Sequence, residues 1–261
     1  MLGALWRYRS FILGMARREF QARYLGSVLG SLWAVLSPLA MVLIYTVVFG
    51  HLMRSRVPGV DDALGYGAFL CAGLFTWAMF TEILQRCVGV FVDQGNLLKK
   101  MSFPRASLPA IVVVSASIHF AIVFAILVLL LLSTGRFPGW AVLGFVPLLA
   151  LQQSLALGLG VALGVMNVFF RDVAHVVAIG LQFWFWLTPI VYPAEVLGER
   201  ARRLLSLNPL TGIAVGYQDI VLHGRWPDWS ACVPQVVAAI AALFFARAVF
   251  RRFSGEMVDH L

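Results

Sequence analysis

Long stretches without charged residues alternate with short charged segments along the whole chain. From Leu25 to Met53, 29 residues pass without Asp, Glu, Lys or Arg, which exceeds the roughly 18 apolar residues that mark a bilayer-spanning candidate. Five further apolar stretches follow, at about 63–81, within 106–135, within 137–170, within 173–194 and at about 229–246. The pattern therefore predicts an all-α polytopic membrane protein with six transmembrane helices.

The composition supports this class. Of 261 residues, 61% are hydrophobic and 12% are charged, whereas a soluble domain has about 45–50% apolar and about 25% charged residues. Soluble, disordered and fibrous proteins are therefore excluded. The three cysteines form no CxxC pair, so neither a disulfide framework nor a zinc site is expected.

Residues 1–24 form a separate, cationic segment. Its polar positions recur with helical spacing, and its apolar positions fall on the other side: Ser10, Gly14, Arg17, Arg18 and Gln21 against Ile12, Met15, Ala16 and Phe20. This periodicity predicts an amphipathic helix at the membrane surface, with a solvated lead-in to the first span as the alternative. The stripe suggests a contact for an anionic lipid head group, made by Arg7, Arg9, Arg17 and Arg18.

The remaining residues, 25–261, form one transmembrane domain. With six crossings both ends lie on one side, and that side and its loops carry thirteen of the 20 Lys and Arg residues. The excess places both termini in the cytoplasm. On the outer side, the long connection after the fifth span predicts two short re-entrant helices at about 194–224, the second beginning at Asn208-Pro209.

Residues for chemistry inside the spans are sparse. His119 is the one ionisable group near mid-depth of the predicted spans; it is either a neutral packing residue or part of a proton relay. No metal-ligand spacing or hydrolase motif is found. The two lysines, Lys99 and Lys100, lie outside any P-loop, so if the protein takes part in ATP-powered transport, the ATPase that binds ATP and Mg²⁺ is another chain.

A basic and aromatic element is predicted on the cytoplasmic side at about 94–105. It contains both lysines and is followed by Pro104 and Pro109, which end any helix. Such an element suits docking into a groove of a soluble partner, and a positive-inside loop without a partner is the alternative. The positions proposed for the contact are Asn96, Leu97, Leu98, Lys99, Lys100, Phe103, Pro104 and Arg105.

Aromatic residues are dense in three of the predicted spans. Four of them are consecutive and therefore cover about 300° of a helix, so they do not all face lipid. These residues either line a path through the protein or belong to packing and interfacial belts. The residues proposed to line a path are Trp33, Tyr45, Phe49, Phe75, Trp77, Phe80, Phe183, Trp184, Phe185 and Trp186.

Several of these segments resemble one family, the permease subunits of type-2 ABC exporters, in the Wzm-like branch that exports O-antigen, capsule or teichoic acid polymers. The similar segments run in the same order over nearly the whole chain: Tyr24-Leu25-Gly26-Ser27, Leu32-Trp33 and Pro38; Asn96 to Pro109; Phe170-Arg171-Asp172-Val173; Leu187 to Pro193; and Asn208-Pro209-Leu210-Thr211 with Tyr217-Gln218-Asp219. Gln218 stands where the family pattern leads us to expect Arg, so any salt bridge of that Arg is in doubt here.

The resemblance implies a homodimeric pore in the bacterial inner membrane. It also implies two copies of a soluble ABC ATPase, whose grooves receive the coupling helices, with Arg171 and Asp172 at a second cytoplasmic turn. By the same likeness, Asn208, Pro209, Tyr217, Gln218 and Asp219 belong to an outer gate. The substrate that the resemblance implies is a lipid-linked polysaccharide, and no nucleic acid or metal is expected as a partner. The aromatic residues proposed above to line a path would then form a polysaccharide path, because aromatic faces stack on the C–H faces of sugar rings without buried charge.

Two other functions share parts of this pattern. A type-2 ABC permease for a small lipid or drug would have the same architecture and differ in its substrate. A membrane-embedded lipid-modifying transferase would need metal-binding acidic residues, and Asp61-Asp62 and Asp172 are too sparse for that. The sequence therefore favours a transport subunit that is not itself an enzyme.

Overall fold

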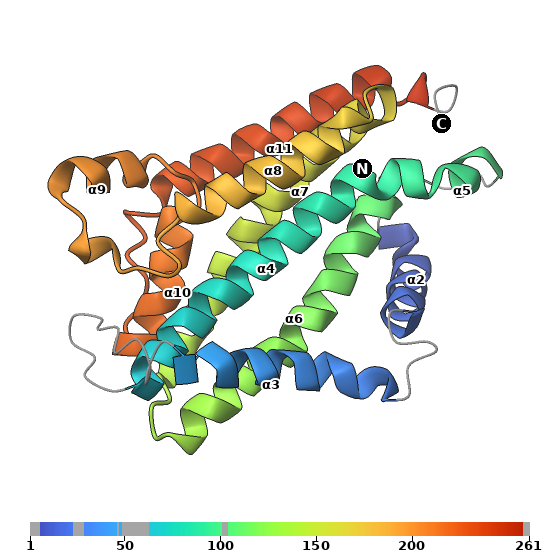
Figure 1. Cartoon of the computed structure of the whole chain (residues 1–261). Helices are drawn as coiled ribbons and strands as arrows, with labels where there is room; N and C mark the ends of the chain where they lie inside the picture. Colours follow the sequence, from blue (N-terminus) through green and yellow to red (C-terminus); the bar gives the residue numbers. More distant parts are fainter. Residues whose placement is uncertain (1–5, 23–28, 46, 49–62, 101–103, 258–261) are drawn as a thin grey trace.

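The computed structural model describes residues 6–22, 29–45, 47–48, 63–100 and 104–257. Within these ranges all regular structure is helical, with no strand. Helices α4 (Ala63–Asp93), α7 (Phe145–Phe169), α8 (Asp172–Trp186) and α11 (Val233–Phe253) run side by side, and α3 (Trp33–Tyr45) runs at a steep angle to them (Figure 1). Helix α5 (Gly95–Lys100), the start of α8 and the end of α11 lie at the same end of the molecule. The predicted all-α membrane fold is confirmed.

Four helices are long and apolar enough to cross a membrane among the residues described. They are α4 (Ala63–Asp93), α6 (Ser107–Ser133), α7 (Phe145–Phe169, preceded by a 3₁₀ turn at Gly139–Gly144) and α11 (Val233–Phe253). Two predicted spans are shorter: α3 (Trp33–Tyr45) has 13 residues and α8 (Asp172–Trp186) has 15. A spanning helix needs about 20 residues, so the count of six spans stays a prediction.

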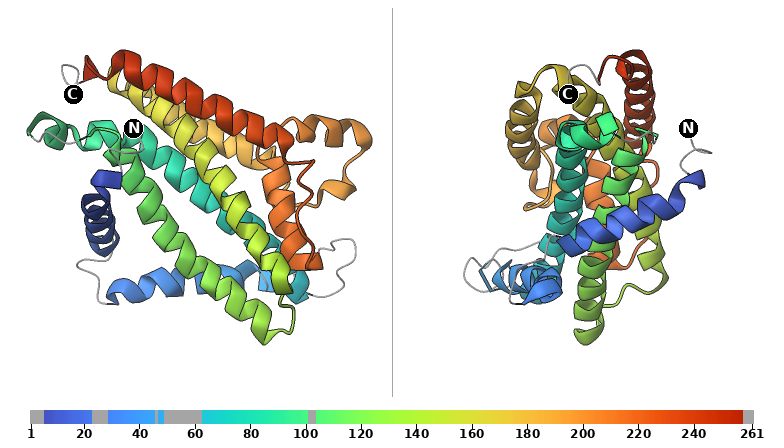
Figure 2. Two further views of the ribbon diagram at one scale, coloured as in Figure 1. Left: turned by 180° about the vertical axis from the view of Figure 1, so that it is seen from behind. Right: turned by 90° about the vertical axis from the view of Figure 1, so that its right-hand side faces the viewer.

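The remaining helices are short and lie around this bundle. Helix α2 (Arg9–Ala22) buries Ile12 and Ala16 and crosses the outside of α6, as Figure 2 shows. Helix α5 (Gly95–Lys100) follows α4 directly. At the other end, α9 (Glu199–Ser206) and α10 (Thr211–His223) form the connection between α8 and α11. The short helices expected at both ends are present.

The core is built around α4 and α7, which approach each other closely. A Cβ on Gly160 would lie 2.6 Å from the Cβ of Cys87, and one on Gly164 would overlap the carbonyl oxygen of Cys87. Glycine is therefore required at both positions, because small residues let two membrane helices touch along their backbones. The buried amide of Asn167 adds a hydrogen bond from α7 to the Val88 carbonyl of α4 at 3.1 Å.

The structure adds detail at two helix boundaries. The sequence places the second span at about 63–81, and α4 continues beyond it without a break to Asp93. In this continuation, the charged residues Glu82 and Arg86 pair with each other at 3.1 Å. Helix α10 begins at Thr211, two residues after Pro209, and Asn208 Oδ1 accepts a hydrogen bond from the backbone N–H of Leu210 at 3.0 Å, as an N-cap residue does.

Candidate functional site

The aromatic residues of α4 and α8 pack against one another. The rings of Trp77 and Phe185 lie 5.6 Å apart, and those of Phe80 and Trp184 lie 5.4 Å apart, each pair edge to face. Phe185 also contacts Trp186, at 5.3 Å. Edge-to-face pairs at such distances are favourable beyond their buried area, so these contacts fix the two helices relative to each other.

A groove of about 460 Å³ lies between these two helices. Its walls combine three aromatic residues with three polar side chains and two apolar ones: Trp77, Thr81, Gln85, Ala178, Leu181, Gln182, Phe185 and Trp186. The amides of Gln85 and Gln182 are exposed, and an amide both donates and accepts hydrogen bonds. The groove therefore presents what a sugar ring needs, aromatic faces beside uncharged hydrogen-bonding groups.

Sequence reasoning missed Gln85 and Gln182. Trp77, Thr81 and Gln85 are spaced four residues apart, which places Gln85 next to Thr81 on the side of the helix that carries Trp77, and Gln182 lies three residues before Phe185, which places these two next to each other. The spacing was a signal that could have found them.

The other aromatic residues predicted for the path are distributed differently. Phe80 is fully buried beneath Trp77 and Trp184, and Phe183 is 69% exposed and outside the groove. Phe75 lines another cavity, between α3, α4 and α6. Trp33 is exposed on α3. The side chain of Tyr45 and the whole of Phe49 lie outside the described residues.

Asn208 connects the groove to the outer loop. Its Oδ1 accepts a hydrogen bond from the indole nitrogen of Trp184 at 2.8 Å, and its Nδ2 donates to the carbonyl of Leu187 at 2.8 Å and to Thr188 Oγ1 at 3.0 Å. Together with Pro209, Asn208 also lines a pocket between α8 and α9. The end of α8 is therefore held by this one amide.

Helix α10 supplies the second contact at this end. Gln218 is buried, and its Nε2 donates to the Pro189 carbonyl at 2.9 Å. Tyr217 is fully buried, and Asp219 pairs with His223 at 3.2 Å. Because Gln218 contacts a neutral carbonyl, this chain joins α10 to the loop after α8 without the salt bridge that an Arg would make.

At the opposite end, short polar segments come together. On α5, Asn96 and Lys99 are exposed, Leu97 is half-buried and Leu98 is buried, which anchors the helix to the bundle. Arg171 and Asp172, before and at the start of α8, are exposed at the same end (Figure 1). Pro104 and Arg105 are half-buried. The side chain of Lys100 and all of Phe103 lie outside the described residues.

The arginines of the N-terminal helix face outward. Arg7, Arg9, Arg17 and Arg18 are all exposed, and the Arg9 guanidinium stacks over the Trp6 ring at 4.7 Å. Glu19, on the same helix, pairs with Arg86 of α4. The helix therefore contacts the bundle through its apolar residues and Glu19, and leaves the cationic stripe free of the bundle.

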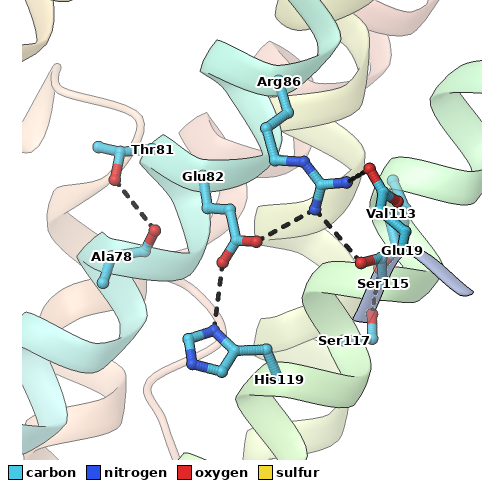
Figure 3. A network of polar contacts seen from close by, with 9 residues as sticks. All are labelled: Glu19, Ala78, Thr81, Glu82, Arg86, Val113, Ser115, Ser117 and His119. Carbon is cyan, nitrogen blue, oxygen red and sulfur yellow. Dashed lines mark hydrogen bonds and ion pairs between the residues drawn. The ribbon is translucent and has the colours of Figure 1, made fainter. Parts of the chain in front are cut away.

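A network of charged side chains lies where α2, α4 and α6 meet (Figure 3). Arg86 donates to Glu19 and, at 3.1 Å, to Glu82, and Glu82 accepts in turn from His119, whose Nδ1 is 3.3 Å away. His119 thus has a carboxylate partner that the sequence did not reveal. Among the described residues, these included, no three His, Cys, Asp or Glu side chains are grouped as metal ligands would be.

Comparison with known proteins gives one consistent result. Residues 11–222 match the family model described as ABC-2 type transporter. The chain is 30% identical over 259 residues to the O-antigen export system permease protein RfbA of Myxococcus xanthus, covering 98% of this chain and 97% of the relative. It is 29% identical to a permease of the same name from Klebsiella pneumoniae over 80% of this chain and 79% of the relative, and 25% identical to the polysialic acid transport protein KpsM of Escherichia coli over 90% of each.

Proposed function

Because this chain belongs to the ABC-2 type transporter family, we propose that it is the membrane-spanning subunit of an ATP-driven exporter of a lipid-linked polysaccharide of O-antigen or capsule type. The names of its relatives favour this substrate over a small lipid or drug, because they are permeases for O-antigen export and polysialic acid transport. The subunit is a transport protein and not an enzyme.

The groove between α4 and α8 is the observation that carries this proposal. A polymer that moves through a membrane protein must make contacts that are weak and repeated. Aromatic faces at Trp77, Phe185 and Trp186 offer stacking without charge, and Gln85 and Gln182 offer hydrogen bonds to hydroxyl groups.

The pore is formed by a homodimer. In the single chain the groove is open on one side, and a second copy facing it would close it into a channel lined twice by the same residues. A two-fold symmetric arrangement is the commonest for identical chains. The outer gate is the region held by Asn208, Pro209, Tyr217, Gln218 and Asp219.

Two copies of a soluble ABC ATPase bind at the end that carries α5. The exposed Asn96 and Lys99 and the exposed Arg171 and Asp172 form the contact, with Lys100, Phe103, Pro104 and Arg105 beside them. ATP and Mg²⁺ bind to that ATPase, since this sequence has no P-loop. This end, with both termini, lies in the cytoplasm of a bacterium, and the bundle spans the inner membrane.

The exposed arginines of α2 contact the anionic head group of the lipid carrier. The side chains of Arg7, Arg9, Arg17 and Arg18 are exposed. Arginine binds phosphate groups through paired hydrogen bonds. Neutralising Arg17 and Arg18 together would lower export while the protein still inserts. Unchanged export in that variant would remove this part of the proposal.

Polymer export in a strain lacking this chain tests the whole proposal. We expect the lipid-linked glycan to accumulate inside that strain and the wild-type chain to restore glycan at the surface. Trp186→Ala and Gln182→Ala, both in the groove, should restore less than a tenth as much. The matched control is Trp140→Ala, because Trp140 is 82% exposed and far from the groove in sequence. Accumulation of a small amphiphile instead of a glycan would refute the proposed substrate.

A further inference from the structure

A second cavity lies between α3, α4 and α6. Its volume of about 400 Å³ falls within the range of about 300–1,000 Å³ that is usual for ligand pockets. It shares Trp77 and Thr81 with the groove described above. Most of its wall is apolar, and its polar groups are Ser37, Thr81, Glu82 and His119.

The polar wall contains a hydrogen-bonded carboxylate and imidazole. His119 Nδ1 lies 3.3 Å from Glu82 Oε2 (Figure 3). A carboxylate only accepts hydrogen bonds, so neutral His119 carries its proton on Nδ1 and has a lone pair on Nε2. The ring's second nitrogen points away from Glu82, and within the described part of the chain it makes no hydrogen bond. The side chain keeps 31% of its surface exposed, so this acceptor is open to a ligand.

Arg86 holds this pair in place from the other side. Its guanidinium donates to Glu82 Oε1 at 3.1 Å, to Ser115 Oγ at 3.4 Å and to Glu19. These contacts fix the Glu82 carboxylate, and the carboxylate fixes the orientation of the His119 ring. A catalytic or binding imidazole is commonly oriented by such a second hydrogen bond.

The charge of the network restricts what the cavity accepts. Among the described residues, the charged and titratable groups that pair with one another here include Glu19, Glu82, Arg86 and His119. The Glu82 carboxylate lies in the cavity wall beside His119. This carboxylate would repel a phosphate group, whereas an uncharged hydroxyl group can donate to His119 Nε2.

We infer that this cavity binds one neutral, hydroxylated sugar ring of the exported polymer, with a ring hydroxyl donating to His119 Nε2. The inference rests on the proposed function and extends it to a second sugar site. Phe75 and Trp77 supply apolar faces for the ring. Because Trp77 and Thr81 belong to both cavities, a sugar held here lies directly beside the groove along which the polymer moves.

A binding measurement on the full-length protein in lipid nanodiscs tests the inference. The probe is octyl glucoside below its micellar concentration, and octyl phosphate is the matched probe with the same tail and an anionic head. In protein labelled with ¹⁵N-histidine, the His119 ring signals are identified by their loss in His119→Gln. We expect octyl glucoside to shift the Nε2 signal of His119 saturably and octyl phosphate to leave it in place.

Two variants test whether the hydrogen-bonded pair of Glu82 and His119, and not packing of the cavity in general, is responsible for binding. Glu82→Gln keeps the shape of the side chain but removes the charge that orients the ring, and should weaken glucoside binding at least tenfold. His119→Phe should abolish saturable binding, measured with radiolabelled glucoside, while His175→Phe, an exposed histidine on α8 outside the cavity, leaves it unchanged.

The outcomes distinguish this inference from the proposed function. An unmoved Nε2 signal, or an equal shift with octyl phosphate, overturns the sugar site and leaves the export assay unaffected. Equal glucoside affinity in wild type, Glu82→Gln and His119→Phe overturns it as well. Conversely, saturable glucoside binding in a chain whose loss does not impair glycan export would overturn the proposed function and keep the sugar site.

Discussion

Arg86 is expected to fasten the N-terminal helix to the bundle, and a double-mutant cycle with Glu19 measures this contact. The exposed fractions of the three side chains are 21% for Arg86, 38% for Glu19 and 18% for Glu82. Removing one partner of a buried ion pair costs about 3–5 kcal/mol of stability. Because these side chains keep some contact with solvent, we expect Arg86→Met to lower the free energy of unfolding by about 3 kcal/mol, at the low end of that range.

The two single variants should differ. Glu19→Gln leaves Arg86 paired with Glu82 and should cost about 1 kcal/mol, the usual value of one net hydrogen bond. Arg86→Met removes the guanidinium that pairs with both Glu19 and Glu82. In the absence of Arg86, replacing Glu19 no longer breaks this ion pair, so the double variant should cost about 1 kcal/mol less than the two single costs together.

Unfolding in detergent micelles with increasing SDS, followed by circular dichroism, gives these free energies. A second measurement reports on α2 itself, because trypsin cleaves after Arg17 and Arg18, which are exposed. Cleavage there should be faster in both single variants than in wild type. Costs that add to within about 0.5 kcal/mol, with unchanged cleavage, would refute the claim that this ion pair holds the helix.

Three further outcomes follow from particular contacts. Gly164→Ala should destabilise the protein by about 1–3 kcal/mol in the same SDS titration. Its control is Gly180→Ala, which should leave the stability unchanged because a Cβ there meets nothing within 4 Å. Equal effects of the two variants would contradict the close contact between α4 and α7. Trp184→Phe loses the hydrogen bond to Asn208 and should cost about 1 kcal/mol in that titration, while Trp226→Phe, at an exposed position, serves as its control. The hydrogen bonds that Ser230 donates hold the pKa of Asp228 below its ordinary value. Any stability from this carboxylate is therefore present at neutral pH and is lost as the pH falls through the lowered pKa. Ser230→Ala should raise the pKa of Asp228 in an NMR titration, and an unchanged value would contradict the contact.

The helical membrane fold could be predicted from the sequence because helices that lie in lipid have an apolar composition. A helix in hydrocarbon must be apolar over about 20 residues, and α6 and α7 each contain a stretch of this kind. The partners of Glu82 and Arg86 on α4 were not readable in the same way. The sequence does not reveal that Glu19 and His119 come from other helices to pair with them.

The candidate site was predicted in part for a similar reason. Trp77, Phe185 and Trp186 were selected by residue type, and the structure places all three at one groove. Residue type did not separate Phe80, which is buried, from Phe183, which is exposed outside the groove. Which face of a helix meets its neighbour depends on packing between α4 and α8, and four consecutive aromatic residues cover too much of the helix for spacing to decide it.

Helix α4 connects all the sites proposed for this chain. Trp77 and Thr81 line both the groove and the second cavity, Arg86 follows slightly more than one turn later and holds α2, and α5 continues from the end of the same helix. Between α4 and α5, the backbone N–H of Gln94 donates to the carbonyl of Val90, and the N–H of Leu98 donates to the carbonyl of Gln94, so helical hydrogen bonding continues from one helix into the next. A packed helix moves as a rigid element because its core neighbours resist compression. A displacement of α5 by the partner ATPase would therefore move Trp77 and Thr81 together, so the groove and the second cavity would change in the same step and not independently.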